Sequence, residues 1–108
     1  MLNFIDILVG IPFKLYFYIM RGIYKIVNKI NGKFYLGSSV NFKKRKEKHL
    51  RDLKKNTHHS ILLQRAYNKY GIENFEFEFI EECENILERE QELLDLIDFS
   101  KSYNVSRF

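Results

Sequence analysis

The sequence predicts an α+β fold, a small three-stranded antiparallel sheet flanked by helices in the element order ββααβα. The first observation is a β-hairpin pattern between residues 21 and 39, with alternating segments on either side of an Asn-Gly turn signal. The second is the strict alternation of Phe and Glu within residues 74–82, which indicates a half-buried strand. Segments with helical periodicity separate and follow these strands, as in a sheet covered by helices. A chain of 108 residues supplies the core for one such domain.

The hairpin is expected to contain strands Gly22–Asn28 and Lys33–Ser38. A loop centred on Asn31-Gly32 would set Tyr35 opposite Asn28, and a wider loop would bring Tyr35 closer to Tyr24. In either of these registers both tyrosines project from the same face of the sheet, because side chains alternate between the two faces along a strand. This placement is consistent with two roles for the tyrosines: an aromatic pair that braces the sheet, or one half of an active site.

Two helices, a strand and a third helix follow the hairpin. Ser60 is a suitable N-cap for the second helix, and Gly71 a suitable end for it. The expected bounds are Val40–Lys55, Ser60–Tyr70, Asn74–Glu82 and Ile86–Asp98, with an extended tail from Tyr103.

Residues 1–20 are apolar on nearly all sides, and Asp6, Pro12 and Lys14 interrupt the run. A membrane-spanning helix needs about 20 predominantly apolar residues, and a signal peptide needs a basic start and a small-residue cleavage site. We interpret the segment as an appendage to a domain of residues 21–108, with membrane attachment as the alternative. The single cysteine, Cys83, excludes an intramolecular disulfide and favours a reducing, intracellular compartment.

Charge is divided unevenly along the chain. Residues 21–55 carry 12 Lys and Arg against two acidic residues, whereas residues 56–108 carry 5 against 11. A basic first half predicts a polyanionic partner such as nucleic acid, with an ordinary solvated helix face as the alternative. The predicted nucleic-acid-binding residues are Lys43, Lys44, Lys46, Lys48 and Arg51.

Arg45 and His49 stand four residues apart on the first predicted helix, so they share one face at the border of its buried stripe. Arg45 can offer a bidentate fork to a phosphate. His49 can accept a proton or hold a water molecule, with Asp52 as a neighbour three residues on. An arginine and a histidine on a basic helix are weak signals when taken alone.

Glu90 lies on the apolar stripe of the last predicted helix. A carboxylate there costs free energy unless it is paired or bound to a metal. One explanation is an ion pair with an arginine such as Arg45 or Arg65. The other is a site for a hard cation such as Mg²⁺, which takes one or two carboxylates together with water and substrate phosphate.

Five separated motifs, in order, resemble the GIY-YIG nuclease domain. They are Gly22-Ile23-Tyr24, Tyr35-Leu36-Gly37, the RKEKH of residues 45–49, the ERE that ends at Glu90, and Tyr103-Asn104. The resemblance covers about residues 21–105 and is strongest to the phage and intron-encoded homing endonucleases of the family. Leu36 is a mild departure, because Ile or Val is commoner there. Homing enzymes of the family usually append a DNA-recognition domain, and the chain ends at Phe108.

The resemblance implies hydrolysis of DNA phosphodiester bonds with a single divalent ion, Mg²⁺ or Mn²⁺, held by Glu90. It implies Tyr24 as the favoured general base, with His49 as the rival. Tyr35 and His49 would position water and phosphate, and Arg45 would stabilise charge on the phosphoryl oxygens. Supporting positions of the family are matched by Gly22, Gly37, His58 and Asn104.

The expected partner is DNA, together with a separate recognition domain or protein, and no membrane partner is expected. The resemblance leaves mitochondrial and phage or bacterial cytoplasmic locations open. A catalytically inactive nucleic-acid-binding module is the alternative function.

Overall fold

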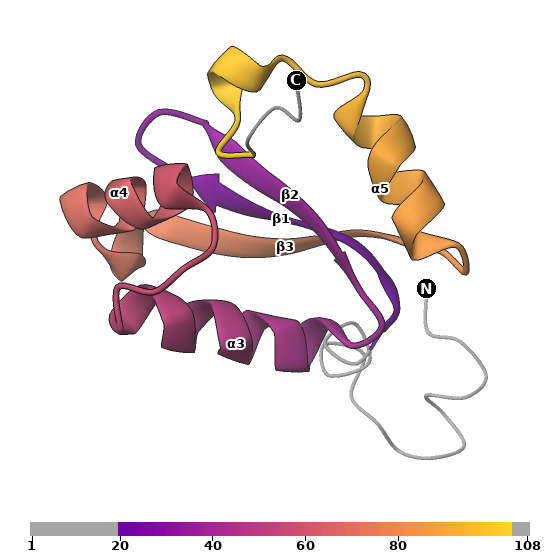
Figure 1. The fold of residues 1–108 in the computed structure, drawn as a ribbon, viewed down its shortest axis with the longest axis horizontal. Helices are drawn as coiled ribbons and strands as arrows, with labels where there is room; N and C mark the ends of the chain where they lie inside the picture. The colour runs from indigo at the N-terminus through magenta and orange to yellow at the C-terminus, as the bar shows by residue number, and fades with distance from the viewer. Residues whose placement is uncertain (1–19, 105–108) are drawn as a thin grey trace.

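The computed structural model describes residues 20–104 (Figure 1). The elements follow the predicted order ββααβα. They are β1 (Gly22–Asn28), β2 (Phe34–Ser39), α3 (Phe42–Lys54), α4 (Ile61–Tyr70), β3 (Phe75–Glu82) and α5 (Ile86–Leu94), with short 3-10 turns η1 (Ile72–Asn74) and η2 (Phe99–Lys101).

The three strands form one antiparallel sheet in the order β2-β1-β3, so β1 is central. Helices α3 and α4 lie on one side of the sheet and α5 lies on the other (Figure 1). Each face has its own apolar cluster. Tyr24 and Ile26 pack with residues of α3 and α4, whereas Ile23 and Leu36 pack with Leu94 of α5. The predicted α+β architecture is confirmed.

The hairpin register differs from the expected one by two residues. Tyr35 lies opposite Ile26, and Tyr24 lies opposite Gly37. The loop is wider than an Asn-Gly turn because the Gly32 N–H donates to the Asn28 carbonyl at 2.8 Å. Gly32 adopts a φ of +76°, which favours glycine. The prediction that Tyr24 and Tyr35 share a face is confirmed, and the wider loop brings them closer.

Side chains cap the N-termini of α3 and α4. Asn41 accepts a hydrogen bond from the Lys44 N–H at 3.1 Å, and Ser60 accepts one from Leu63 at 3.2 Å. The expected extension of α5 to Asp98 is wrong. Asp98 instead accepts from the Ser100 N–H at 2.9 Å and starts the separate turn η2.

The ends of the described part pack on the sheet and on α3. Ser102 bridges to Phe34, and the Tyr103 N–H donates to the Phe34 carbonyl at 2.7 Å. Met20 is buried, and its carbonyl accepts from the Phe42 N–H at 3.2 Å. The rest of the predicted appendage and of the tail lies outside the described residues. Within residues 20–104, no helix is long and apolar enough to cross a membrane.

Candidate active site

Tyr24 lies on the central strand with its hydroxyl group against a histidine of α3. Its side chain is 1% exposed, and Tyr24 Oη is 2.5 Å from His49 Nε2. His49 reaches this position from the buried side of α3, which also carries Phe42 and Leu53. The residues that the sequence suggests as general base and rival base are therefore direct neighbours.

Hydrogen bonds continue from His49 into the loop before α4. His49 Nδ1 is 2.6 Å from His58 Nε2, and the two rings stack with centroids 4.9 Å apart. His58 Nδ1 accepts from the Ser60 backbone N–H at 2.9 Å. A buried polar chain thus runs from Tyr24 through both imidazoles to a main-chain amide.

Tyr35 has a histidine partner of its own. Tyr35 Oη is 2.9 Å from His59 Nε2, and the Tyr35 ring meets the ring of His49 edge-on at 5.4 Å. The two tyrosines and three histidines form one group, here called the tyrosine–histidine cluster: Tyr24, Tyr35, His49, His58 and His59. The sequence reasoning missed His59, for which the only signal was its position beside His58.

Arg45 and Glu90 bring opposite charges close to this cluster. Burial raises the pKa of Tyr24 overall, and the exposed Arg45 opposes this rise through its charge and a hydrogen bond. Glu90 Oε1 accepts from Ser38 Oγ at 2.9 Å, on the sheet face covered by α5, and its negative charge acts to raise the pKa of both Tyr24 and Tyr35. Ser38 is a second residue that the sequence reasoning missed.

The ionic partners suggested by the sequence differ from those in the structure. Neither Arg45 nor Arg65 is among the ion pairs of residues 20–104, so they do not pair with Glu90. Asp52 does not pair with His49. Instead its Oδ2 lies 2.7 Å from Lys48 Nζ, one helical turn away on α3.

Burial dominates the electrostatics of the cluster. It raises the pKa of Tyr24 well above its usual value, and it raises the pKa of Tyr35 to about 12, with Glu90 adding to the latter shift. Burial lowers the pKa of His49 to about 3 and of His58 to about 4, because an imidazolium there would lose its hydration; neighbouring histidines add to both shifts. Both imidazoles are therefore neutral at pH 7.

The motif glycines permit close approach. A Cβ on Gly37 would lie 2.5 Å from Tyr24 Oη, and a Cβ on Gly22 would clash with the Glu81 carbonyl oxygen. Gly37 therefore leaves the space that the Tyr24 hydroxyl group occupies. Gly22 lets β1 pass close to β3, next to a β-bulge.

Asn104 holds the outer edge of β2. Its Oδ1 accepts from the Leu36 N–H, and its Nδ2 donates to the Leu36 carbonyl, both at 2.8 Å. The side chain therefore takes the place of a neighbouring strand. Because Leu36 stands between Tyr35 and Gly37, this clamp fixes the strand that carries them.

The predicted basic residues of α3 do not all face the same way. Lys43, Lys44 and Arg51 are exposed, and Lys48 is exposed but paired with Asp52. Lys46 is half-buried, with Nζ 5.3 Å from the ring centroid of Phe77 on β3.

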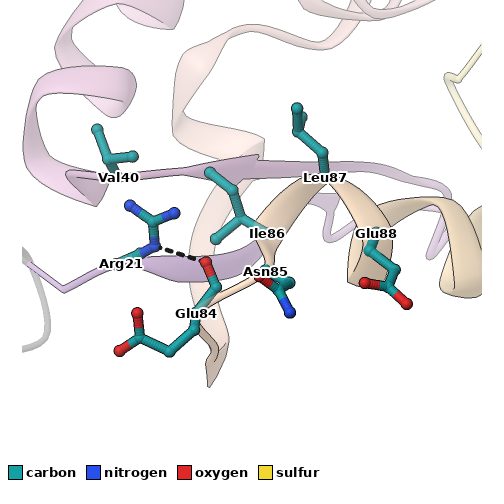
Figure 2. A pocket seen from close by; sticks show the side chains of 7 residues that line it. All are labelled: Arg21, Val40, Glu84, Asn85, Ile86, Leu87 and Glu88. Carbon is teal, nitrogen blue, oxygen red and sulfur yellow. Dashed lines mark hydrogen bonds between the residues drawn. The ribbon is translucent and has the colours of Figure 1, made fainter.

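A separate hollow of about 460 Å³ lies where Arg21 meets the start of α5 (Figure 2). Val40, Ile86 and Leu87 give it an apolar wall, and Arg21 Nε donates to the Glu84 carbonyl at 2.8 Å. None of the predicted site residues lines it.

Residues 20–104 match the family model of the GIY-YIG catalytic domain. The chain belongs to the GIY-YIG family. It is 47% identical over 73 residues to intron-associated endonuclease 1 of Enterobacteria phage T4, and 41% identical over 56 residues to a probable intron-encoded endonuclease 1 of Neurospora crassa. These matches cover 64% and 52% of the chain, but only 29% and 17% of the relatives' lengths.

The fold of this GIY-YIG domain also resembles solved structures. The catalytic domain of the homing endonuclease I-TevI superposes with a TM-score of 0.73 at 40% identity, covering 80% of the chain and 98% of that domain. A point mutant of the same catalytic domain gives a TM-score of 0.72 at 39% identity, covering 82% of the chain and 95% of the mutant domain.

Proposed function

We propose that this GIY-YIG chain is the catalytic part of a DNA endonuclease of the homing type, which hydrolyses phosphodiester bonds. The observation that carries the proposal is that Glu90 accepts a 2.9 Å hydrogen bond from Ser38 on β2, the strand that also carries Tyr35, and its charge acts to raise the pKa of Tyr24 and Tyr35. A carboxylate, two phenols and an arginine so close together form a candidate site for phosphate chemistry. The intron endonucleases among the relatives support this reaction class.

Glu90 is the proposed ligand of a single divalent cation, Mg²⁺ or Mn²⁺. No group of three or more His, Cys, Asp or Glu able to hold a metal occurs within residues 20–104. A cation here would therefore rely on one carboxylate, water and substrate phosphate, a donor set that suits Mg²⁺. Ser38 donates to one oxygen of Glu90, and the carboxylate has a second oxygen to offer. When bound, such a cation would polarise the scissile phosphate and stabilise the leaving oxygen.

Tyr24 is the proposed general base. A phenolate at this position would be stabilised by hydrogen bonding with His49 and by the charge of Arg45. Its raised pKa means that deprotonation requires added positive charge, which the bound cation would supply. His49 is the weaker candidate because both of its ring nitrogens are engaged and its pKa is lowered to about 3.

The remaining residues of the site would orient the reactants. Tyr35 and His49 would position the attacking water and the phosphate, and Arg45 would stabilise charge that develops on the phosphoryl oxygens. Supporting roles fall to residues that hold these side chains in place, namely Gly22, Gly37, His58 and Asn104.

DNA would lie along the exposed basic side of α3, with Lys43, Lys44 and Arg51 against phosphates. Such contacts carry little sequence information, so we propose that a separate recognition domain or protein selects the target. Because the relatives come from a phage and a fungus, we propose an intracellular site of action, in the cytoplasm or an organelle.

Plasmid cleavage by the full chain, with and without Mg²⁺, tests this function. Glu90→Gln is expected to lower the cleavage rate by about 100-fold or more, because it removes the carboxylate charge. Glu88→Gln, at an exposed position on the same helix, is the matched control and should cleave like the wild type. Unchanged circular dichroism would show that both variants fold, and wild-type cleavage by Glu90→Gln would overturn the metal site.

The same assay separates the alternative function. A wild-type protein that binds DNA in a salt-dependent way, yet cleaves it in neither Mg²⁺ nor Mn²⁺, would be a binding module that uses the basic side of α3.

A further inference from the structure

The direction of the hydrogen bonds in the buried chain can be worked out from its far end. The Ser60 backbone N–H can only donate, and His58 Nδ1 is its acceptor at 2.9 Å. A neutral imidazole carries one proton, so the proton of His58 is on Nε2. Lowered pKa values keep both buried histidines neutral at pH 7, which satisfies this condition.

The same reasoning passes to His49. His58 Nε2–H points at His49 Nδ1, 2.6 Å away, which must therefore accept. The proton of His49 is then on Nε2, the atom that lies 2.5 Å from Tyr24 Oη. His49 thus donates to the tyrosine, and the Tyr24 oxygen is the acceptor.

Reversing the chain would place two hydrogens against each other. In the reversed chain, the Tyr24 hydroxyl group would donate to His49 Nε2, and His49 Nδ1–H would donate to His58 Nε2. The proton of His58 would then have to be on Nδ1. The Ser60 N–H already occupies that approach, and Ser60 is held by capping α4 and by a 2.8 Å hydrogen bond from its hydroxyl to the Tyr103 carbonyl.

We propose that the Ser60 amide and His58 are positioning groups that lock His49 in its Nε2–H form, so that His49 donates to Tyr24 and does not receive its proton. The tautomer assignment does not depend on the proposed function, and only its role in catalysis rests on that function. In each turnover the Tyr24 phenolate takes one proton from the attacking water and later releases that same proton from Oη to water that enters the site. His49 keeps its own proton throughout, and no proton passes into the interior.

Long-range ¹H–¹⁵N correlation spectra of the ¹⁵N-labelled full chain test the lock directly at pH 7.5, without metal or DNA. The expected spectra show His49 and His58 each protonated on Nε2 and bare on Nδ1. A His49 protonated on Nδ1, or one that averages between the two forms, would overturn the proposal. This result does not depend on cleavage, so it stands apart from a failure of the proposed function.

Two variants of His58 provide a matched pair. The amide of His58→Gln can accept from Ser60 and donate to His49, which preserves the Nε2–H form. The carboxylate of His58→Glu can only accept when ionised, so His49 should move its proton to Nδ1. We expect the tautomer signals of His49 to exchange in His58→Glu alone, with a cleavage rate roughly 10- to 100-fold below that of His58→Gln. An unchanged His49 tautomer in His58→Glu would refute the lock.

Discussion

The two buried, neutral histidines make the stability of the domain sensitive to mild acid. His49 is 2% exposed and His58 is 7% exposed. Burial holds the pKa of His49 at about 3 and that of His58 at about 4. In the unfolded chain both groups return to a pKa of about 6.5. Unfolding below pH 6.5 therefore takes up protons that the folded state excludes.

The sign and size of the effect follow from this difference. Because the folded pKa values are depressed, the stability from the neutral imidazoles is fully present above pH 6.5 and is lost as the pH falls toward 4 and 3. At about 1.4 kcal/mol per pH unit, lowering the pH to about 5 costs roughly 2 kcal/mol for each histidine. The pair together would lose about 4 kcal/mol, a large part of the roughly 5–15 kcal/mol typical of a domain.

Urea unfolding of the full chain, followed by circular dichroism at pH 7.5, 6 and 5 and constant ionic strength, measures the loss. Replacing His58 by Gln removes one titrating group and should halve the change in unfolding free energy. His59→Gln is the comparison: His59 is exposed, and its pKa is lowered less strongly, first by partial burial and then by Lys48 and Arg45, so this variant should reduce the change by less than His58→Gln does. The lowered pKa values of Asp52 and Asp98 affect stability only near and below pH 4, outside this window. A wild-type change of less than about 1 kcal/mol between pH 7.5 and 5 would refute the burial argument.

Two further perturbations test the motif glycine and the basic side of α3. Gly37→Ala places a Cβ 2.5 Å from Tyr24 Oη and should lower stability by about 1–3 kcal/mol and cleavage at least about tenfold. Gly32→Ala, strained at a φ of +76° but in open space, should cost stability and leave the cleavage rate per folded molecule unchanged, and equal cleavage by both variants would contradict the steric reasoning. The double replacement Lys43→Gln/Lys44→Gln should make the slope of log binding constant against log salt shallower by about 1 for each phosphate that a lysine no longer neutralises. Lys101→Gln, at η2, should leave that slope unchanged in the same titration, and an unchanged slope in the double variant would exclude these lysines from the DNA interface.

Local signals predicted most of the fold. The bounds of β1 are as expected, those of β2 are shifted by one residue at each end, and β3 starts one residue later than expected, because alternation and turn residues act within a few positions. The errors arose where side chains compete with regular structure. Asn28 accepts from the Ile30 N–H at 2.9 Å and helps to widen the hairpin loop. Asp98 starts a new turn where helical periodicity alone would continue α5.

Site residues were predictable where a side chain was unusual for its position in a helix or strand. Glu90 was out of place on an apolar stripe, and it lies half-buried against Ser38. His59 and Ser38 are not unusual for their positions, and their contacts depend on how the loop before α4 and helix α5 pack on the sheet. Tertiary placement of this kind has no signature within a window of a few residues.

The buried hydrogen bonds show a further limit. The sequence could name Tyr24 and His49 as rival bases, but choosing between them depends on which atom of each carries a proton. The backbone N–H of Ser60 fixes these proton positions, and it lies against His58 because Ser60 is the N-cap of α4. A main-chain N–H has no side-chain identity to recognise, so no residue pattern could indicate it. Its effect passes through two imidazoles to the Tyr24 oxygen, where it decides that the histidine donates. The helix cap therefore bears on the chemistry of the tyrosine, although it touches no candidate substrate group.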